Sequence, residues 1–258
     1  MKTAIITGGA GGLGKALSKA LLKGGWHVVV LDLPGEALDA CDELENVTAY
    51  ACDLTSEAEL ATVAQTIIVS RPSIDLVIYN AGVTAVNLFA ESTDTAHRKL
   101  FEINYFAAVN CARLFLEPLR KTKGVHLAIS SVAGFSPLYK RTAYAASKHA
   151  MEGFFNSLRS EEKEFGVSVL IAAPSFVATN IGWAETNKDG MSRPGSAADA
   201  VDVMTPEDAA IEIIKGLEKR RTMNPIGRVA KLAWIIQRLS PKLFQRLMEK
   251  QVAKKQKS

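Results

Sequence analysis

Short apolar runs alternate along this chain with longer segments whose apolar residues recur at helical spacing. Six of the short runs are predicted to be strands, at residues 4–6, 26–32, 47–53, 75–79, 125–130 and 167–173. A strand that is apolar along its whole length is typical of a sheet covered on both faces. Because such strands alternate here with helices, the pattern predicts an α/β fold with a parallel sheet.

Helical periodicity fills most of the gaps between these strands. We expect helices at about residues 15–22, 34–44, 57–69, 93–121 and 142–165. Ser56 is a good N-cap for the third of them, because it precedes two glutamates in the first turn. Gly166 ends the fifth helix, and Thr205-Pro206-Glu207 begins another one.

The 258 residues suit one large α/β domain, because no linker divides them. We expect a catalytic domain over residues 1–225 and a helical extension over residues 226–258. The domain is expected to include a substrate loop at about residues 175–204. Much of that loop, from Gly182 to Asp202, is polar and rich in Gly, Ser, Ala and Asp.

Nothing in the sequence indicates secretion, a membrane span or a metal site. Met1-Lys2-Thr3 leads directly into the first strand, and no apolar run approaches the roughly 20 residues that span a bilayer. Cys41, Cys52 and Cys111 lack metal-ligand spacing, and the four histidines are scattered. We therefore expect a cytoplasmic protein with reduced thiols and no metal.

The basic charge is concentrated near the C-terminus. The net charge of +4 hides 13 Lys or Arg against two Glu between Lys215 and Ser258. Two helical patterns, Arg228 to Leu239 and Lys242 to Lys250, combine this charge with apolar stripes. This basic amphipathic tail either packs on the domain or a second subunit, or lies on an anionic membrane surface. Nucleic acid is not an expected partner, because no base-stacking or groove-reading motif accompanies the charge.

A glycine-rich stretch, Thr7-Gly8-Gly9-Ala10-Gly11-Gly12-Leu13-Gly14, joins the first strand to the first helix. Unpaired N–H groups and the positive end of the dipole make a helix N-terminus suitable for a phosphate. Glycines allow the backbone to approach that phosphate closely, because no Cβ intervenes. The stretch predicts a site for a dinucleotide pyrophosphate.

Polar residues gather at the ends of the predicted strands, where a doubly wound sheet binds its ligand. These residues are Asp32, Asp53, Asn80 and Ser131, with Pro174 after the sixth strand. The Asp32 carboxylate can accept hydrogen bonds from ribose hydroxyls and repel a 2′-phosphate. Because the neighbouring Leu33 offers no positive charge, the sequence favours NAD over NADP.

Tyr144 and Lys148 lie four residues apart in a predicted helix and therefore share one face. A free phenol has a pKa near 10, too high for efficient proton transfer near neutral pH. A neighbouring ammonium group favours the phenolate and lowers that pKa. The pair therefore predicts an acid–base centre.

With these motifs the sequence resembles the classical short-chain dehydrogenases/reductases, over roughly residues 3–220. Thr7-Gly8-x-x-x-Gly12-x-Gly14 matches the cofactor fingerprint, and Tyr144-x-x-x-Lys148 matches the catalytic motif. Ser131 and Asn104 match the rest of a catalytic tetrad. The resemblance implies further cofactor contacts from Leu13, Asp32, Asp53, Leu54, Asn80, Ala81, Gly82, Pro174, Val177 and Thr179. Ser175 stands where the family usually has glycine, which leaves the local turn open.

The resemblance implies a Rossmann-type doubly wound parallel sheet with helices on both faces, in a homodimer or homotetramer. It makes Tyr144 the general acid/base and Ser131 a hydrogen-bond donor to the substrate oxygen. Lys148 would lower the pKa of Tyr144 and bind the nicotinamide ribose, and Asn104 would hold a water between Lys148 and solvent. Ser130 is the alternative to Ser131, but the spacing to the tyrosine favours Ser131.

These features predict an NAD-dependent oxidoreductase that transfers a hydride between nicotinamide and an alcohol or ketone. The loop and the apolar tail favour a lipophilic substrate such as a steroid, a retinoid or a long-chain lipid intermediate. One alternative is an NAD-binding sensor or scaffold without catalysis, which would be expected to lack the tetrad. Another is an enzyme of the same family that acts on a small polar alcohol or ketone. A sugar-nucleotide epimerase would need a larger C-terminal domain and different glycine spacing.

Overall fold

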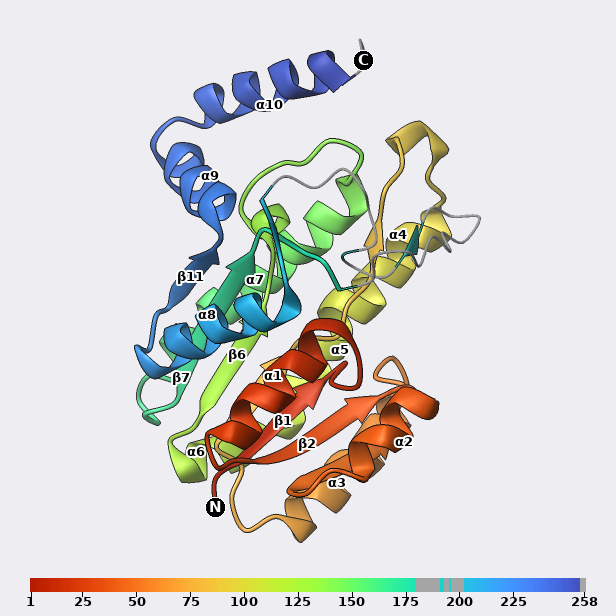
Figure 1. Cartoon of the computed structure of the whole chain (residues 1–258), viewed down its shortest axis with the longest axis vertical. Coiled ribbons are helices and arrows are strands. Elements are labelled where there is room, and N and C mark those ends of the chain that lie inside the picture. The colour runs from red at the N-terminus through yellow and green to blue at the C-terminus, as the bar shows by residue number, and fades with distance from the viewer. Residues whose placement is uncertain (180–190, 193–194, 196–201, 256–258) are drawn as a thin grey trace.

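Seven parallel strands form one central sheet in the computed structural model (Figure 1), which describes residues 1–179, 191–192, 195 and 202–255. The sheet order is β11-β7-β6-β4-β1-β2-β3. The strands are β1 (Thr3–Thr7), β2 (His27–Asp32), β3 (Val47–Ala51), β4 (Leu76–Tyr79), β6 (Val125–Ile129), β7 (Ser168–Pro174) and β11 (Met223–Ile226). The order reverses between β1 and β4, so the carboxyl ends of these two strands flank the crevice where such sheets bind ligands.

Two layers of helices cover the sheet. The longer helices are α1 (Gly12–Lys23), α2 (Glu36–Asp42), α3 (Glu57–Ser70), α4 (Asp94–Phe101), α5 (Ala107–Leu114), α6 (Leu116–Thr122), α7 (Thr142–Glu161), α8 (Pro206–Glu218), α9 (Arg228–Leu239) and α10 (Pro241–Lys255). One apolar core joins α1, α2 and α8 to one face of the sheet, and a second joins α3, α5 and α7 to the other face. Neighbouring residues of β1 enter opposite cores, since Ile6 belongs to the first and Ile5 to the second.

The six strands predicted from apolar runs are confirmed, and a seventh was missed. β11 is only four residues long and contains Pro225, so its sequence carries little strand signal. An edge strand tolerates proline, because one side of it needs no hydrogen-bond donors. β11 occupies the edge beside β7, with Pro225 opposite Ala173. The expected boundary after residue 225 falls inside this strand, and the tail helices begin at Arg228.

The expectation of one long helix over residues 93–121 is wrong. The segment forms α4, then a π-helical turn η2 (Glu102–Phe106), then α5 and α6. The break between α5 and α6 lies at Phe115 (φ −98°, ψ 8°). Pro118 explains it, because the proline ring clashes with the carbonyl of the residue four positions earlier, Leu114. The predicted helix 142–165 is also shorter, since α7 ends at Glu161.

The C-terminal helices fold back onto the domain through one face of α9. Ala230 and Ala233 are buried against Val132, which lies in the short helix η3 (Val132–Gly134). Phe244 of α10 joins the same cluster. Of the described helices, none is long and apolar enough to cross a membrane. The three cysteines are buried, free thiols, as expected.

The expected substrate loop is only partly covered by the described residues, since 180–190, 193–194 and 196–201 lie outside them. Two short pairings fix it, one joining its two ends and the other holding a point inside it. β5 (Thr84–Ala85) pairs antiparallel with β9 (Met191–Ser192), and β8 (Phe176–Val177) pairs parallel with β10 (Val203–Met204). The chain on both sides of the loop is therefore fixed next to the carboxyl ends of the sheet strands.

Candidate active site

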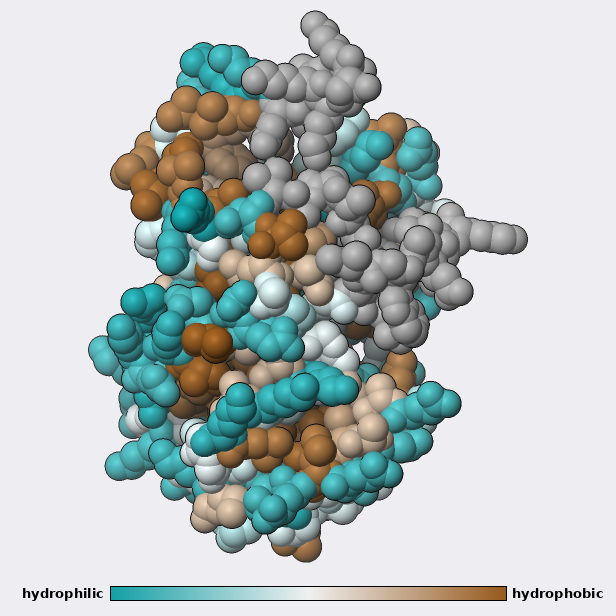
Figure 2. Space-filling model, viewed as in Figure 1, coloured by the Kyte–Doolittle hydropathy of each residue, from teal (hydrophilic) through white to brown (hydrophobic). Residues whose placement is uncertain are grey.

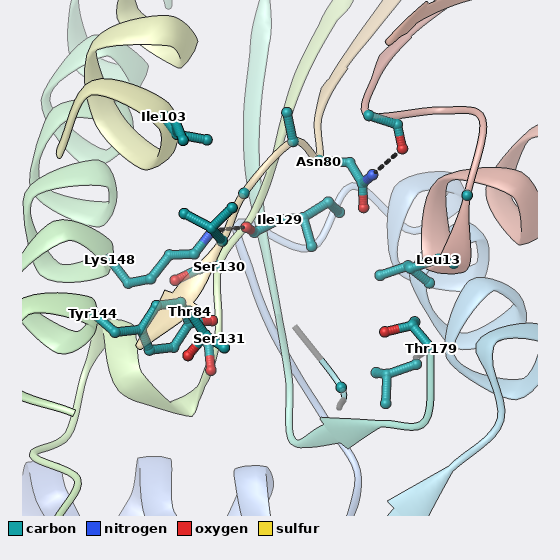
Figure 3. Close-up of a pocket in the computed structure, with 18 of the residues that line it drawn as sticks. Leu13, Asn80, Thr84, Ile103, Ile129, Ser130, Ser131, Tyr144, Lys148 and Thr179 are labelled. Carbon is teal, nitrogen blue, oxygen red and sulfur yellow. Dashed lines mark hydrogen bonds between the residues drawn. The ribbon is translucent and has the colours of Figure 1, made fainter. Parts of the chain in front are cut away.

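One large cleft opens at the carboxyl ends of the sheet strands, and it collects nearly all of the predicted site residues (Figure 3). Those that line it are Gly8, Gly12, Leu13, Asp32, Asp53, Leu54, Asn80, Ala81, Gly82, Ser131, Tyr144, Lys148, Pro174, Val177 and Thr179. Two predicted residues are not part of the lining: Gly14 packs beneath the glycine loop, and Asn104 is fully buried.

The glycine loop is shaped by contacts that exclude side chains. Gly8 has φ +63° and Gly12 has φ +50°, which L-residues with a Cβ rarely adopt. A Cβ on Gly8 would lie 2.9 Å from Ala81 Cα, and one on Gly12 would lie 2.9 Å from Thr179 Cβ. A Cβ on Gly14 would overlap the carbonyl oxygen of Gly8. The loop therefore packs so closely against the segments after β4 and β7 that no side chain fits at these glycines.

The start of α1 is well suited to a pyrophosphate. Its N-cap is Gly11, which has no side chain to occupy the first N–H groups of the helix, and the first turn contains no acidic residue. Those unpaired N–H groups face a cleft lined by the glycine loop, which gives an anion both hydrogen bonds and a favourable dipole. The residues present therefore fit a dinucleotide cofactor.

Asn80 and Thr7 hold this loop against β4. The Asn80 amide donates to the carbonyl oxygens of Gly8 (2.8 Å) and Thr7 (3.1 Å). The Thr7 hydroxyl in turn accepts the backbone N–H groups of Asn80 (3.0 Å) and Ala81 (3.1 Å). Figure 3 shows Asn80 reaching across to the loop at the rim of the cleft. Asn80 therefore acts on the cofactor site largely through the shape of the loop.

Two aspartates mark the far end of the cleft, beyond the glycine loop. The Asp32 carboxylate accepts the N–H groups of Ala10 (3.0 Å) and Leu33 (2.9 Å), so it also fixes the loop. Asp53 accepts both the backbone N–H and the hydroxyl of Thr55. Each oxygen of a carboxylate accepts more than one hydrogen bond, so both groups can still bind a ligand hydroxyl or amine. Of the described residues, no cluster of three or more His, Cys, Asp or Glu side chains could hold a metal ion.

Tyr144 and Ser131 meet at the other end of the cleft. Tyr144 lies in the first turn of α7, and Ser131 lies two residues after the end of β6 and caps η3 by accepting the N–H of Ala133 (3.2 Å). Figure 3 shows both side chains pointing into the same part of the cleft, and the Ser131 hydroxyl acts to lower the pKa of Tyr144. A phenol and a hydroxyl are thus presented together to any group that enters there.

The expected cause of a lowered tyrosine pKa is corrected by the structure. Burial raises the pKa of Tyr144 above its usual value, and the groups that oppose this are the Ser131 hydroxyl and the charge of Arg141. Lys148 is buried one turn away and donates from Nζ to the carbonyl oxygen of Ile129 (3.0 Å). Burial lowers the pKa of Lys148 to about 8, against the opposing charge of Glu152.

The Asn104 side chain has a structural role that the sequence did not reveal. Its Oδ1 accepts the N–H of Val83 (2.8 Å), and its Nδ2 donates to the carbonyl oxygen of Val83 (2.9 Å) and to the Ser147 hydroxyl (3.0 Å). It lies behind Gly82, where an added Cβ would be 3.0 Å from Asn104 Oδ1 and 3.6 Å from Lys148 Nζ. Because both N–H groups of the side-chain amide are engaged, any water held by Asn104 would have to donate to Oδ1 or bind its main chain.

The ambiguity between the two serines is resolved by their partners. Ser130 is buried and donates to Glu152 Oε1 (2.6 Å), whereas Ser131 meets Tyr144 in the cleft. Sequence reasoning missed Glu152, because a lone glutamate in a helix usually faces solvent. It also missed several residues at the wide end of the cleft: Thr84, Leu138, Phe176, Val229 and Met248. The last two come from the tail helices, whose position no local pattern could give.

Comparisons with known proteins agree with this geometry. The family model described as short chain dehydrogenase matches residues 2–190. The mouse protein named Dehydrogenase/reductase SDR family member 7B is 30% identical over 98% of this chain and 82% of its own length. Its Xenopus laevis namesake is 29% identical over 98% of this chain and 83% of its own.

Solved structures show the same fold. A short chain dehydrogenase from Burkholderia cenocepacia in complex with NADP superposes with a TM-score of 0.83, at 23% identity over 95% of this chain and 96% of that one. A short chain dehydrogenase/reductase from Burkholderia phymatum in complex with NAD gives 0.81, at 21% identity over 94% of both chains.

Two substitutions in the loop test the packing argument. Gly14→Ala is expected to destabilise the protein by about 2 kcal/mol or more and to weaken NADH binding, because its Cβ overlaps the Gly8 carbonyl. Gly11→Ala is the matched control, because a Cβ there meets nothing within 4 Å and Gly11 has an extended backbone. Thermal unfolding and NADH fluorescence would measure both, and equal effects of the two variants would contradict the argument.

Proposed function

Because this chain belongs to the short chain dehydrogenase family, we propose that it transfers a hydride between a nicotinamide cofactor and an alcohol or ketone. The observation that carries the proposal is the Tyr144–Ser131 pair beside the buried Lys148, at the end of a cleft that begins at the glycine loop. The bound nicotinamide would supply the hydride in reduction and accept it in oxidation.

The side chains of the site divide the remaining work. Tyr144 gives its proton to the carbonyl oxygen during reduction and takes it back from the alcohol during oxidation. Ser131 donates a hydrogen bond to the same oxygen and stabilises the charge that develops on it. Lys148 presents an ammonium group to the ribose hydroxyls and to the neighbouring phenol. Its pKa of about 8 keeps much of it charged near neutral pH.

We propose NAD as the cofactor, in preference to NADP. The support is Asp32, whose carboxylate lies at the end of β2 on the rim of the cleft and would repel a 2′-phosphate. The proposed contacts divide the cofactor into four parts. The pyrophosphate site is shaped by Gly8, Gly12, Leu13 and Gly14, and the adenine is bordered by Asp53 and Leu54. The middle of the cofactor is lined by Asn80, Ala81 and Gly82, and the nicotinamide is flanked by Pro174, Val177 and Thr179.

We propose a lipophilic substrate, because the lining of the cleft presents more apolar than polar surface. Outside the proposed cofactor contacts, its apolar side chains include Val83, Val86, Ile103, Leu138, Phe176, Val229 and Met248, and the polar and charged Thr84, Thr95, Arg98, Lys99, Glu102, Lys140 and Arg141 also line it. Such a lining favours a steroid, a retinoid or a long-chain lipid intermediate over a small polar alcohol. We also propose a cytoplasmic homodimer or homotetramer, for which the support is the family resemblance.

The test of this reaction is NADH formation with NAD and a panel of hydroxysteroids, retinols and long-chain alcohols, repeated with NADP. We expect kcat/KM to favour NAD, and Asp32→Asn to reduce that preference by about tenfold, because the repulsion of a 2′-phosphate is lost. Glu36→Gln is the matched control, since Glu36 is an exposed acid on the same rim. A wild-type preference for NADP would contradict the assignment of Asp32.

The role of Tyr144 is tested by Tyr144→Phe. Turnover is expected to fall by about two to four orders of magnitude, because the proton donor is removed, while the Kd for NADH stays within about threefold. Tyr50→Phe should leave turnover unchanged, since Tyr50 is a partly exposed tyrosine of β3 that does not line the cleft. If Tyr144→Phe turned over normally, the chain would be a cofactor-binding protein that uses other chemistry, as the sensor alternative requires.

We propose further that the tail lies on an anionic membrane surface. α9 and α10 expose Leu239 (81%), Leu232 (58%), Ile235, Leu243 and Leu247, and Figure 2 shows this apolar surface over α9 and the adjoining end of α10. Between residues 228 and 250 the charged side chains are six cations, Arg228, Lys231, Arg238, Lys242, Arg246 and Lys250, and one anion, Glu249. Exposed leucines among cations are typical of an interfacial helix. Val229 and Met248 also line the cleft, so a lipophilic substrate would enter beside this surface.

Sedimentation with vesicles tests the membrane contact. We expect binding to phosphatidylcholine vesicles that contain phosphatidylserine, and a loss of about tenfold or more with Leu232→Ser and Leu239→Ser combined. Val69→Ser is the control, because Val69 is an exposed apolar residue of α3, away from the tail. If the wild type did not bind, and the double variant instead changed the mass in solution, the surface would be a subunit interface.

A further inference from the structure

Three successive residues at the end of β6 each face a different turn of α7. Lys148 Nζ donates to the carbonyl oxygen of Ile129 (3.0 Å), and the Ser131 hydroxyl faces Tyr144, whose pKa it acts to lower. Between them, the Ser130 hydroxyl donates to Glu152 Oε1 (2.6 Å). Tyr144, Lys148 and Glu152 follow one another at intervals of four residues and therefore share one face of α7.

Glu152 is a buried carboxyl for which the reaction described above has no use. Only 7% of Glu152 is exposed. The backbone of η3 lies close over the Glu152–Ser130 hydrogen bond, because a Cβ on Gly134 would overlap Glu152 Oε1 and Ser130 Oγ. An isolated buried carboxylate is costly, so its partners must compensate for the lost hydration. Here they are the Ser130 hydroxyl and the positive charges of Lys148 on α7 and Arg238 on α9.

The charges of Glu152 and Lys148 depend on each other. Burial raises the pKa of Glu152, and the Ser130 hydrogen bond and the cations around it lower that pKa again. Burial lowers the pKa of Lys148 to about 8, and the Glu152 carboxylate opposes this. Lys148 loses its proton as the pH rises through about 8, so the negative charge of Glu152 moves that loss to higher pH.

We propose that Glu152 is a positioning residue, a role that rests on the function proposed for this cleft. Through Ser130 it fixes the end of β6, and with it Ser131, against the helix that carries Tyr144. Through its charge it keeps Lys148 in the ammonium form. It touches neither substrate nor cofactor. The buried Glu152 therefore acts on the reaction only through its neighbours, by placing Ser131 and by keeping Lys148 charged.

Two variants separate the charge of Glu152 from its hydrogen bond. Glu152→Gln keeps an oxygen that accepts from Ser130 but removes the charge, and Ser130→Ala removes the bond but keeps the charge. Glu161→Gln is the matched control, because Glu161 is an exposed acid on the same helix. All three would be compared with the wild type in three measurements: thermal unfolding, the Kd for NADH, and ketone reduction across about pH 6 to 10.

With Glu152→Gln we expect the loss of reduction and of NADH affinity at high pH to move to lower pH by about one unit. Removing the negative charge beside Lys148 lowers the pKa of Lys148, so its ammonium group is lost at lower pH. With Ser130→Ala we expect kcat to fall about tenfold, with the KM for NADH little changed, because Ser131 is less well placed. Glu161→Gln should match the wild type in every measurement.

The proposal would be overturned if Glu152→Gln and Ser130→Ala lowered only the unfolding temperature and left the pH profiles and kcat of the folded enzyme in place. That result would make Glu152 a packing residue. An absence of wild-type turnover with every compound, together with a shifted NADH-binding profile in Glu152→Gln, has a different meaning. It would refute the proposed reaction and leave the effect of Glu152 on Lys148 established.

Discussion

The close seating of α1 on the ends of β1 and β4 is the contact on which the cleft depends. It exists because Gly8 and Gly14 bring backbone against backbone, with Asn80 and Thr7 supplying the hydrogen bonds across the gap. Any side chain at Gly14 would push the helix away from the strand ends. The unpaired N–H groups at the helix start would then point away from the cleft, and the anion site would be lost.

The other half of the cleft depends on a second contact, between the end of β6 and α7. Here the contacts come from side chains of different character, an ammonium group, a carboxylate and a phenol, all on the inward face of α7. In such a place desolvation dominates, which is why the pKa of Tyr144 is raised and that of Lys148 is lowered. Partners such as Ser131, Arg141 and Glu152 then adjust each group. The pKa values of the site residues are thus set by burial as much as by residue type.

The tail helices α9 and α10 contact the cleft on one side and solvent on the other. α9 is bound to η3, the turn that follows Ser131, and its Arg238 adds charge near Glu152. The other face of α9, together with α10, carries exposed leucines, and Val229 and Met248 border the opening of the cleft. One short element therefore contacts the catalytic wall on one side and presents an apolar, basic surface on the other.

The sequence by itself determined the parallel sheet, the glycine loop and about a third of the cleft lining, because apolar periodicity and motif spacing are local properties of the chain. It failed where a neighbour in space decides: β11 is a strand only because β7 offers it an edge, and the long predicted helix breaks at the π turn and ahead of Pro118. Burial also lay beyond the sequence. It engaged the Asn104 amide with Val83, raised the pKa of Tyr144 and brought Glu152 to Ser130. Only the tertiary structure sets desolvation and long-range partners, because both depend on how distant segments pack.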